Sequence, residues 1–284
     1  MKIGIVTWNS GERHKLFMEQ AHPEMETTIV ADSASDEEKI EACRDVEAII
    51  MVAASISVDV LKSCPEVKLL QGIGAGFDKV DVKAINALGI PYANNGGSNA
   101  IPVAEFTLSL ITGIARGVFR GVQNAKEGNW NSGLRETPSW EITGKCIGII
   151  GMGAIGQRVA KMLVGYDCDT VYYKRHRLSS EIERKLHARY LPLNELLQIS
   201  DVVTMHNSLN NSTIGMIGRE QLAMMKPSSF LINTTRGACI DQQALYESLI
   251  DGRIAGAGLD VLAEEPTPRD NPLWQLNNVI ITPH

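Results

Sequence analysis

The chain has 284 residues, of which 44% are hydrophobic and 21% are charged, and its formal net charge is −6 at pH 7. This length exceeds what one hydrophobic core usually serves and predicts two domains, and the acidic balance gives no electrostatic reason to expect nucleic acid or an anionic membrane as a partner. No apolar run approaches the roughly 18 residues of a membrane span. The N-terminal "MKIGIVTW" is typical of a first strand and not of a signal peptide.

The cysteines occur without CxxC spacing, and their number is odd. They are Cys43, Cys64, Cys146, Cys168 and Cys239. This pattern indicates reduced thiols in a cytoplasmic protein and predicts neither a disulfide framework nor a metal site.

Strands that alternate with helices fill the first part of the chain. The predicted strands are Ile3–Thr7, Ala48–Val52 and Lys68–Ile73, and the predicted helices between them include Asp36–Arg44 and Val80–Leu88. Such alternation predicts an α/β fold whose parallel sheet is covered by helices on both faces. The turn-rich "NNGGSN" at Asn94–Asn99 indicates a boundary, so that one domain comprises residues 1–97 and the other comprises residues 98–284.

A long helix is predicted over Ile101–Lys126, with Pro102 in its first turn. Its apolar residues fall on more than one face, which is typical of a buried helix, and we expect it at a domain or subunit interface. Strand–helix alternation then resumes, with strands predicted at Cys146–Ile150, Thr170–Tyr173, Val202–Met205, Phe230–Asn233, Ala255–Leu259 and Val279–Ile281.

The stretch "IGIIGMGAIGQRVA" contains Gly151-x-Gly153-x-x-Gly156 between a predicted strand and a predicted helix. In this context Gly151 forms the tight turn, Gly153 lets a pyrophosphate approach the backbone, and Gly156 lets the helix pack close to the strand. The helix start, with Ala154 and Ile155, supplies free N–H groups for the phosphates. The alternative is a tight turn that binds no ligand.

The next predicted strand, "TVYYKRHR", ends without the carboxylate that usually binds the ribose 2′-hydroxyl of NAD. It ends instead with Lys174, Arg175, His176 and Arg177. Cations at this place favour a 2′-phosphate, so we predict a preference for NADP(H). The alternative is a solvated basic turn in a protein that binds NAD(H).

The later strands of a parallel sheet deliver polar residues to the edge where ligands bind. The residues that follow these strands are His206 and Asn207, then Thr234, Thr235 and Arg236, then Asp260, Glu264 and Glu265, and finally His284. A cation, carboxylates and an imidazole therefore meet a dinucleotide at one edge, which is difficult to explain by chance.

The motifs "GIIGMGAIG", "NTTRGACID", "GLDVLAEEP" and "NVIITPH" resemble those of the D-isomer-specific 2-hydroxyacid dehydrogenases. The resemblance extends over the chain, because "GIGAGFDKVD" and "NNGGSNAIPVAEF" match the substrate loop and the start of the interdomain helix. It implies two doubly wound parallel-sheet domains, a flavodoxin-like substrate domain and a Rossmann dinucleotide-binding domain. It also implies an oxidoreductase that transfers a hydride between a nicotinamide and the C2 carbon of a small 2-oxo acid, such as glyoxylate or hydroxypyruvate.

The resemblance also implies a role for individual residues. Arg236 would hold the substrate carboxylate and polarise the carbonyl, and His284 would protonate the carbonyl oxygen. Glu265, in preference to its neighbour Glu264, would pair with the imidazole, and Asp260 would face the nicotinamide carboxamide. These residue types suit the chemistry, because Arg binds carboxylates bidentately and His exchanges protons near neutral pH.

In the first domain, the resemblance assigns the substrate carboxylate to the backbone N–H groups of Gly74, Ala75 and Gly76. Asn99 and Val103 would line the cleft between the domains, and a homodimer would form through the long helix.

Several features distinguish this chain within the resemblance. Formate dehydrogenases carry Gln at the position of Glu265, which disfavours formate as the substrate. The family continues past the position of His284 through a loop and a helix, so we expect either a longer natural chain or a truncated form with poor activity. The alternative function, typical of the corepressor relatives, is a dinucleotide-sensing binding protein with little turnover.

Overall fold

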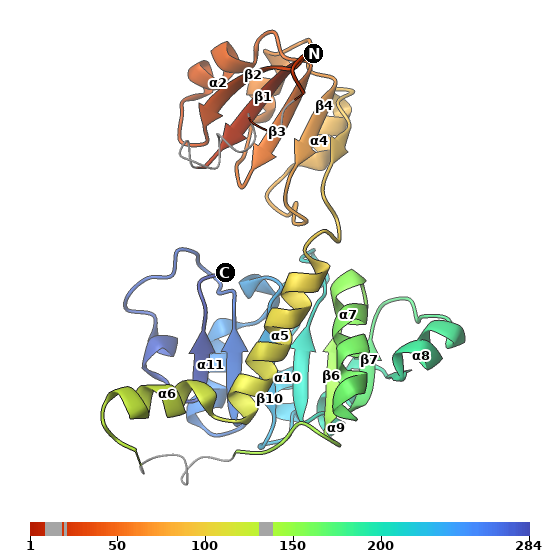
Figure 1. Ribbon diagram of the computed structural model, residues 1–284, viewed down its shortest axis with the longest axis vertical. Helices are drawn as coiled ribbons and strands as arrows, with labels where there is room; N and C mark the ends of the chain where they lie inside the picture. Colours follow the sequence, from red (N-terminus) through yellow and green to blue (C-terminus); the bar gives the residue numbers. More distant parts are fainter. Residues whose placement is uncertain (9–18, 20–21, 131–138) are drawn as a thin grey trace. The chain divides into compact units, whose positions relative to one another are not determined.

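The computed structural model describes residues 1–8, 19, 22–130 and 139–284, which form two compact units, Met1–Ser98 and Asn99–His284 (Figure 1). Each unit contains its own parallel sheet. The predicted α/β fold is confirmed.

The sheet of the first unit has the order β2-β1-β3-β4-β5, and its strands are parallel. Its strands are β1 (Lys2–Thr7), β2 (Glu26–Ala31), β3 (Ala48–Val52), β4 (Leu69–Gly72) and β5 (Tyr92–Ala93), and its helices include α2 (Asp36–Cys43), α3 (Val58–Lys62) and α4 (Val82–Ala87). This is the flavodoxin-like order. The core contains Val6, Ile49 and Leu70, which are almost fully buried because parallel strands are covered on both faces.

Three elements in the described part of the first unit were not predicted: β2, α3 and β5. Strand β2 lies at the edge of the sheet and has no buried residue. Its sequence therefore lacks the long apolar run that marks a buried parallel strand. Helix α3 has five residues and β5 has two, which is too short for a periodic signal.

The sheet of the second unit has seven parallel strands in the order β12-β11-β10-β9-β6-β7-β8. The strands are β6 (Cys146–Ile150), β7 (Asp169–Tyr173), β8 (Ala188–Tyr190), β9 (Val202–Met205), β10 (Phe230–Asn233), β11 (Gly256–Leu259) and β12 (Val279–Ile281). The strand order reverses between β6 and β9, which makes their carboxyl ends the topological switch point of a Rossmann fold. The three-residue strand β8 was not predicted.

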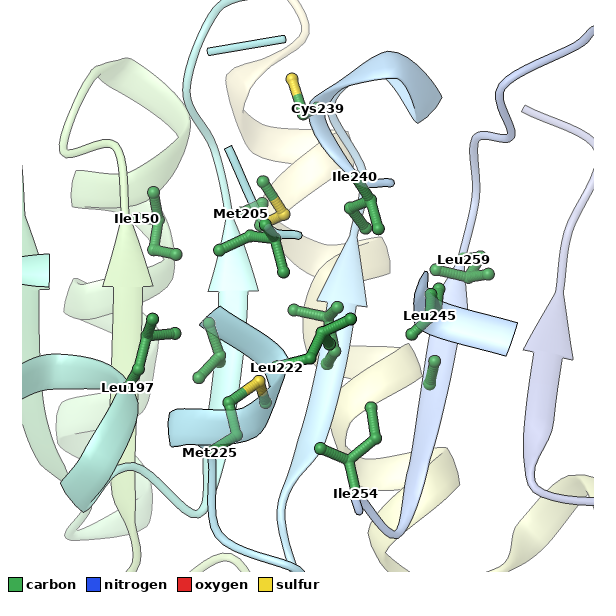
Figure 2. Close-up of a cluster of buried hydrophobic side chains, with 14 of the residues drawn as sticks. Ile150, Leu197, Met205, Leu222, Met225, Cys239, Ile240, Leu245, Ile254 and Leu259 are labelled. Carbon is green, nitrogen blue, oxygen red and sulfur yellow. The ribbon is translucent and has the colours of Figure 1, made fainter. Parts of the chain in front are cut away.

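Helices cover both faces of this sheet (Figure 1). The helices of the unit are α5 (Ala100–Ala115), α6 (Val118–Lys126), α7 (Ala154–Leu163), α8 (Ser180–Leu186), α9 (Leu193–Ile199), α10 (Arg219–Met224) and α11 (Gln242–Ile250). Side chains of α5 and α7 share one buried cluster with the sheet, and α9, α10 and α11 share the other. Figure 2 shows this second cluster, in which Leu197, Leu222 and Leu245 reach the strands from these three helices.

The prediction of one long helix over Ile101–Lys126 is wrong. Gly117 adopts a left-handed conformation with φ of 61°, and the axes of α5 and α6 differ by 65°. Gly113 supports the bend, because a Cβ there would lie 2.3 Å from the Phe119 ring. Within the described residues no single helix is long and apolar enough to cross a membrane; α5 and α6 pass that test only as a bent pair, by length and composition.

Candidate active site

The glycine loop joins β6 to α7 at the switch point. Gly151 has φ of 96°, and a Cβ on it would lie 2.4 Å from the backbone nitrogen of Asn207. The turns after β6 and β9 therefore pack backbone against backbone, which only glycine permits.

The other two glycines differ from each other in their surroundings. A Cβ on Gly156 would lie 2.2 Å from the carbonyl oxygen of Gly151, so Gly156 lets α7 pack onto the strand end. A Cβ on Gly153 would meet no protein atom within 4 Å. Gly153 is also the N-cap of α7 and makes no side-chain cap. The space beside Gly153 is therefore open, and a ligand can approach the backbone closely at the start of the helix.

A cavity of about 500 Å³ opens at this place. The predicted cofactor residues that line it are Gly151, Gly153, Lys174, Arg175, His206 and Asn207, and further lining residues include Met152, His176, Ser208, Asn210, Ser212, Thr213 and Met216. The remaining predicted cofactor residues do not line it. Ala154, Ile155 and Gly156 belong to α7, whereas Thr234, Thr235, Arg236 and Asp260 follow β10 and β11.

Two polar atoms at the end of β9 are buried without a hydrogen-bond partner among the described residues: Nδ1 of His206 and Oδ1 of Asn207. The other ring nitrogen of His206, Nε2, lies 3.0 Å from Oγ1 of Thr204. Burial lowers the pKa of His206 to about 3, so its imidazole is neutral near pH 7. Unpaired buried polar atoms are costly, and a ligand with hydroxyl groups can satisfy them.

These features together fit a dinucleotide. The open space at Gly153 suits a pyrophosphate, the helix start supplies donors, and the unpaired atoms of His206 and Asn207 suit ribose hydroxyl groups. Within the described residues, no group of three or more His, Cys, Asp or Glu side chains is placed to hold a metal ion.

Two of the cations after β7, Lys174 and Arg175, have uncharged oxygen atoms as partners. Nζ of Lys174 donates to the carbonyl oxygen of Met152 at 3.3 Å, and Nη2 of Arg175 donates to Oγ of Ser212 at 3.1 Å. Both side chains line the cavity, where a phosphate could join them.

The predicted cofactor residue Arg177 forms an ion pair within the protein. Nε and Nη2 of Arg177 donate to the two carboxylate oxygens of Glu183, each at 2.8 Å, and Tyr172 donates to the same carboxylate at 2.8 Å. Arg177 holds the pKa of Glu183 below its usual range, so the pair is charged. Its guanidinium is engaged in this ion pair and Arg177 lies outside the cavity lining, which favours a structural role over a contact with the cofactor.

The turn after β10 carries Arg236. Oδ1 of Asn233 accepts from the backbone nitrogen and Oγ1 of Thr235 at 2.9 and 2.8 Å, and its Nδ2 donates to the carbonyl oxygen of Arg236 at 3.0 Å. Nη1 of Arg236 donates to the carbonyl oxygen of Thr235 at 2.7 Å. Thr234 is held from the other side, since its Oγ1 lies 3.2 Å from that of Thr107 on α5. These hydrogen bonds therefore fix the backbone position from which the Arg236 side chain extends.

Gly237 brings the Arg236 turn against the loop after β11. A Cβ on Gly237 would lie 1.9 Å from the carbonyl carbon of Leu262 and 2.4 Å from the nitrogen of Ala263. The two loops are thus in direct backbone contact, and the second of them carries Glu265.

Glu265 joins this loop to His284. Its Oε1 accepts from the backbone nitrogen of Leu262 at 3.0 Å, and its Oε2 lies 2.7 Å from Nδ1 of His284. An ionised carboxylate can only accept, so Nδ1 donates and Nε2 is left to exchange a proton with a ligand. Both side chains are partly exposed, at 36% for Glu265 and 48% for His284.

Asp260 is connected to the same region through Thr282. Oγ1 of Thr282 donates to Oδ1 of Asp260 at 2.7 Å, and its carbonyl oxygen accepts from the nitrogen of His284 at 3.0 Å. Burial raises the pKa of Asp260, whereas the Thr282 hydrogen bond and the charge of His284 lower it.

The remaining predicted substrate residues lie in different units. In the first unit, the loop after β4 contains Gly74, Ala75 and Gly76, and its carbonyl oxygens accept from Asn95 and Asn94. In the second unit, Asn99 is the N-cap of α5, and its Oδ1 is buried without a hydrogen-bond partner among the described residues.

Sequence reasoning did not identify Thr282, Asn210, Ser212 or Thr213. The "NNST" stretch did contain a signal, because an Asn two residues before a Ser is typical of a turn closed by the Asn side chain. Thr282 has no comparable local pattern, since its partner Asp260 is distant in sequence.

The chain is similar to known proteins in sequence and in fold. A model of the D-isomer specific 2-hydroxyacid dehydrogenase, NAD binding domain, matches residues 108–284. The glyoxylate reductase of Korarchaeum cryptofilum (strain OPF8) is 37% identical over 248 residues, which are 86% of this chain and 74% of that protein.

Solved structures are similar over the whole chain. The crystal structure of a glyoxylate reductase from Paecilomyes thermophila has a TM-score of 0.84 and 28% identity, and covers 100% of this chain and 88% of that one. The acyclic imino acid reductase (Bsp5) in complex with NADPH and D-Arg has a TM-score of 0.85 and 28% identity, with 100% and 89% covered.

The alternative of a dinucleotide-sensing binding protein is not favoured, because the family model describes dehydrogenases and the similar proteins named above are reductases. The predicted family and reaction class are confirmed. The chain belongs to the D-isomer specific 2-hydroxyacid dehydrogenases, NAD(P)-dependent oxidoreductases that act on small 2-hydroxy and 2-oxo acids.

Proposed function

We propose that the protein reduces a small 2-oxo acid, with glyoxylate and hydroxypyruvate as the first candidates, and that NADPH is its preferred cofactor. The observation that carries this proposal is the Glu265–His284 pair on a loop packed against the Arg236 turn, in the unit that contains the dinucleotide cavity. The glyoxylate reductases among the relatives support the choice of substrate.

In the proposed reaction, the second unit supplies the substrate cation and the proton. Arg236 binds the carboxylate of the 2-oxo acid and polarises its carbonyl, because a guanidinium forms paired hydrogen bonds with a carboxylate. His284 delivers a proton from Nε2 to the carbonyl oxygen, where negative charge develops. Glu265 holds the ring through Nδ1, so that Nε2 has a fixed direction. The bound nicotinamide supplies the hydride.

We assign the substrate-domain role to the first unit. Within the part of the chain that the structure describes, the N–H groups of Gly74, Ala75 and Gly76 donate to no protein acceptor, so they remain available for a carboxylate. Ala53, Ala54 and Ile56 are small or apolar and carry no charge, which supports a substrate without a charged distal group.

The proposed preference for NADPH rests on Lys174 and Arg175. Both line the cavity at the end of β7, where a 2′-hydroxyl-binding carboxylate would otherwise lie. The NADPH complex of the imino acid reductase supports a nicotinamide cofactor with a 2′-phosphate in this fold.

The test is the oxidation of NADPH, and separately of NADH, at 340 nm with glyoxylate, hydroxypyruvate, pyruvate and a bulkier 2-oxo acid. We expect turnover with small acids and a higher kcat/KM with NADPH. Equal or better kcat/KM with NADH would refute the cofactor preference. Cofactor binding without turnover on any acid would refute the reductase.

We also propose a homodimer through α6. Val118, Phe119 and Val122 on this helix are 50%, 44% and 50% exposed, and a neighbouring hollow of about 260 Å³ is lined by Phe119, Phe230 and Val279. Light scattering of the wild type should give twice the mass of one chain. A Val122→Glu variant should shift toward the monomer, whereas Lys126→Glu on the same helix should not. A monomeric wild type would contradict the proposal.

A further inference from the structure

The loop after β9 contains a hydrogen-bonded unit formed by Asn210 and Ser212. Oδ1 of Asn210 accepts from the backbone nitrogen of Ser212 at 2.9 Å and from its Oγ at 2.6 Å. The single hydroxyl proton of Ser212 is therefore used by Asn210. The hydroxyl oxygen can act toward other groups only as an acceptor.

Arg175 occupies this acceptor. Its Nη2 donates to Oγ of Ser212 at 3.1 Å, which connects the end of β7 with the loop after β9. Arg175, Ser212 and Asn210 all line the dinucleotide cavity. The contact therefore fixes a guanidinium of an otherwise exposed side chain beside the cavity.

The loop that carries Ser212 is itself held by hydrogen bonds of Thr213. The buried hydroxyl of Thr213 accepts from the nitrogen of Asn210 at 2.8 Å and lies 2.8 Å from the carbonyl oxygen of Ser208, to which it donates. Ser212 thus holds Arg175 from a fixed point, which lowers the conformational entropy that Arg175 would lose on binding a ligand.

The charge of the cavity lining indicates which kind of ligand Arg175 would bind. The cavity lining contains Lys174, Arg175 and His176 and no Asp or Glu among the described residues. Ser212 is uncharged, so it positions the guanidinium without neutralising it. A carboxylate at position 212 would bind Arg175 more strongly, but it would also repel a phosphate.

We propose that Ser212, oriented by Asn210, is a positioning residue that holds Arg175 for the 2′-phosphate of NADPH and so helps to set the choice between NADPH and NADH. This inference rests on the proposed preference for NADPH. The same arrangement would add little for NADH, which has no group with negative charge at this position.

The experiment compares Ser212→Ala with wild type in steady-state reduction of glyoxylate. We expect KM for NADPH to rise about three- to tenfold, as for the loss of one hydrogen bond to a charged group at a partly exposed site. We expect kcat to stay within a factor of two and KM for NADH to stay unchanged. Ser212→Thr, which keeps the hydroxyl, should restore KM for NADPH. Asn211→Ala is the matched control, because Asn211 is an exposed neighbour on the same loop and does not line the cavity.

A double-mutant cycle with Arg175→Ala separates positioning from a general effect on the loop. If Ser212 acts through Arg175, Ser212→Ala should have no effect on KM for NADPH in the Arg175→Ala background. Inhibition by 2′-AMP and by 5′-AMP gives a second readout, and only the inhibition constant of 2′-AMP should change in Ser212→Ala.

The outcomes distinguish this inference from the function on which it rests. Equal effects of Ser212→Ala on NADPH and NADH, or the same effect with and without Arg175, would overturn the role of Ser212 while the preference for NADPH stands. A wild type that turns over glyoxylate with no preference for NADPH would overturn both, and the reductase activity would remain.

Discussion

The two ends of the strand edge in the second unit are built differently. At β6, β7 and β9 there is an open cavity, lined by glycine backbone, buried unpaired polar atoms and cations held by uncharged oxygens. At β10, β11 and β12 the polar side chains already contact one another, as in the Thr282–Asp260 and Glu265–His284 pairs at 2.7 Å. The first region provides space and unused hydrogen-bonding capacity, which suits binding. The second provides side chains fixed in advance, which suits proton transfer and the orientation of a substrate.

Removal of the imidazole of His284 tests whether the two regions have separate roles. We expect His284→Gln to lower kcat by about 10²- to 10⁴-fold, the usual contribution of a general acid, with an unchanged Kd for NADPH. The measurements are turnover at 340 nm and cofactor fluorescence titration. His187→Asn is the control, since His187 is exposed at the end of α8. A loss of cofactor affinity that matches the loss of kcat would show that the two regions are not separate.

Two glycines of the loop allow cofactor binding and stability to be tested separately. Gly153→Ala should keep the thermal midpoint, because the new Cβ meets no protein atom within 4 Å, but should raise Kd for NADPH by about tenfold or more. Gly156→Ala should lower the free energy of unfolding by about 1–3 kcal/mol, because the new Cβ would clash with the carbonyl oxygen of Gly151. Calorimetry and titration of both variants check this contrast, and an unstable Gly153→Ala would contradict it.

The buried imidazole of His206 predicts a pH dependence of stability. Its pKa of about 3 lies below that of an unfolded histidine, near 6.5, so the unfolded chain binds a proton that the folded chain excludes. His206 therefore has little effect on the free energy of unfolding above about pH 6.5, and it lowers that free energy as pH falls toward 3. Between pH 7 and pH 5 the loss from this group is about 2 kcal/mol. Urea unfolding of wild type and His206→Asn should show a smaller loss in the variant, and equal losses would refute the prediction.

Thr282 joins Asp260 to the His284 segment. Without the Thr282 hydroxyl, the burial that raises the pKa of Asp260 loses one opposing interaction, so the pKa should rise further in Thr282→Val. Asp260 would then be protonated at a higher pH. As pH is lowered, KM for NADPH should therefore begin to rise at a higher pH in the variant than in wild type. Thr282→Ser should behave like wild type, and parallel pH profiles in all three proteins would count against this role.

Sequence reasoning identified features that depend on one stretch of chain. The glycine motif, the residues that follow β9, β10 and β11, and most strands of the second unit could be predicted, because buried parallel strands are apolar runs followed by polar residues. The partner of Arg177 could not be predicted, since Glu183 lies on the next helix and its orientation depends on packing around Tyr172. The bend at Gly117 was missed because apolar periodicity continues on both sides of it.

The contact of Gly237 with Leu262 and Ala263 has a consequence for how this protein can change over generations. Any side chain at position 237 would overlap the neighbouring backbone, so the distance between the arginine turn and the glutamate loop cannot be adjusted by small substitutions there. Under the proposed roles of Arg236 and Glu265, new substrate preferences must therefore arise from substitutions at other positions. The distance between the two loops is thus the constant feature, and the side chains at other positions are the variable one.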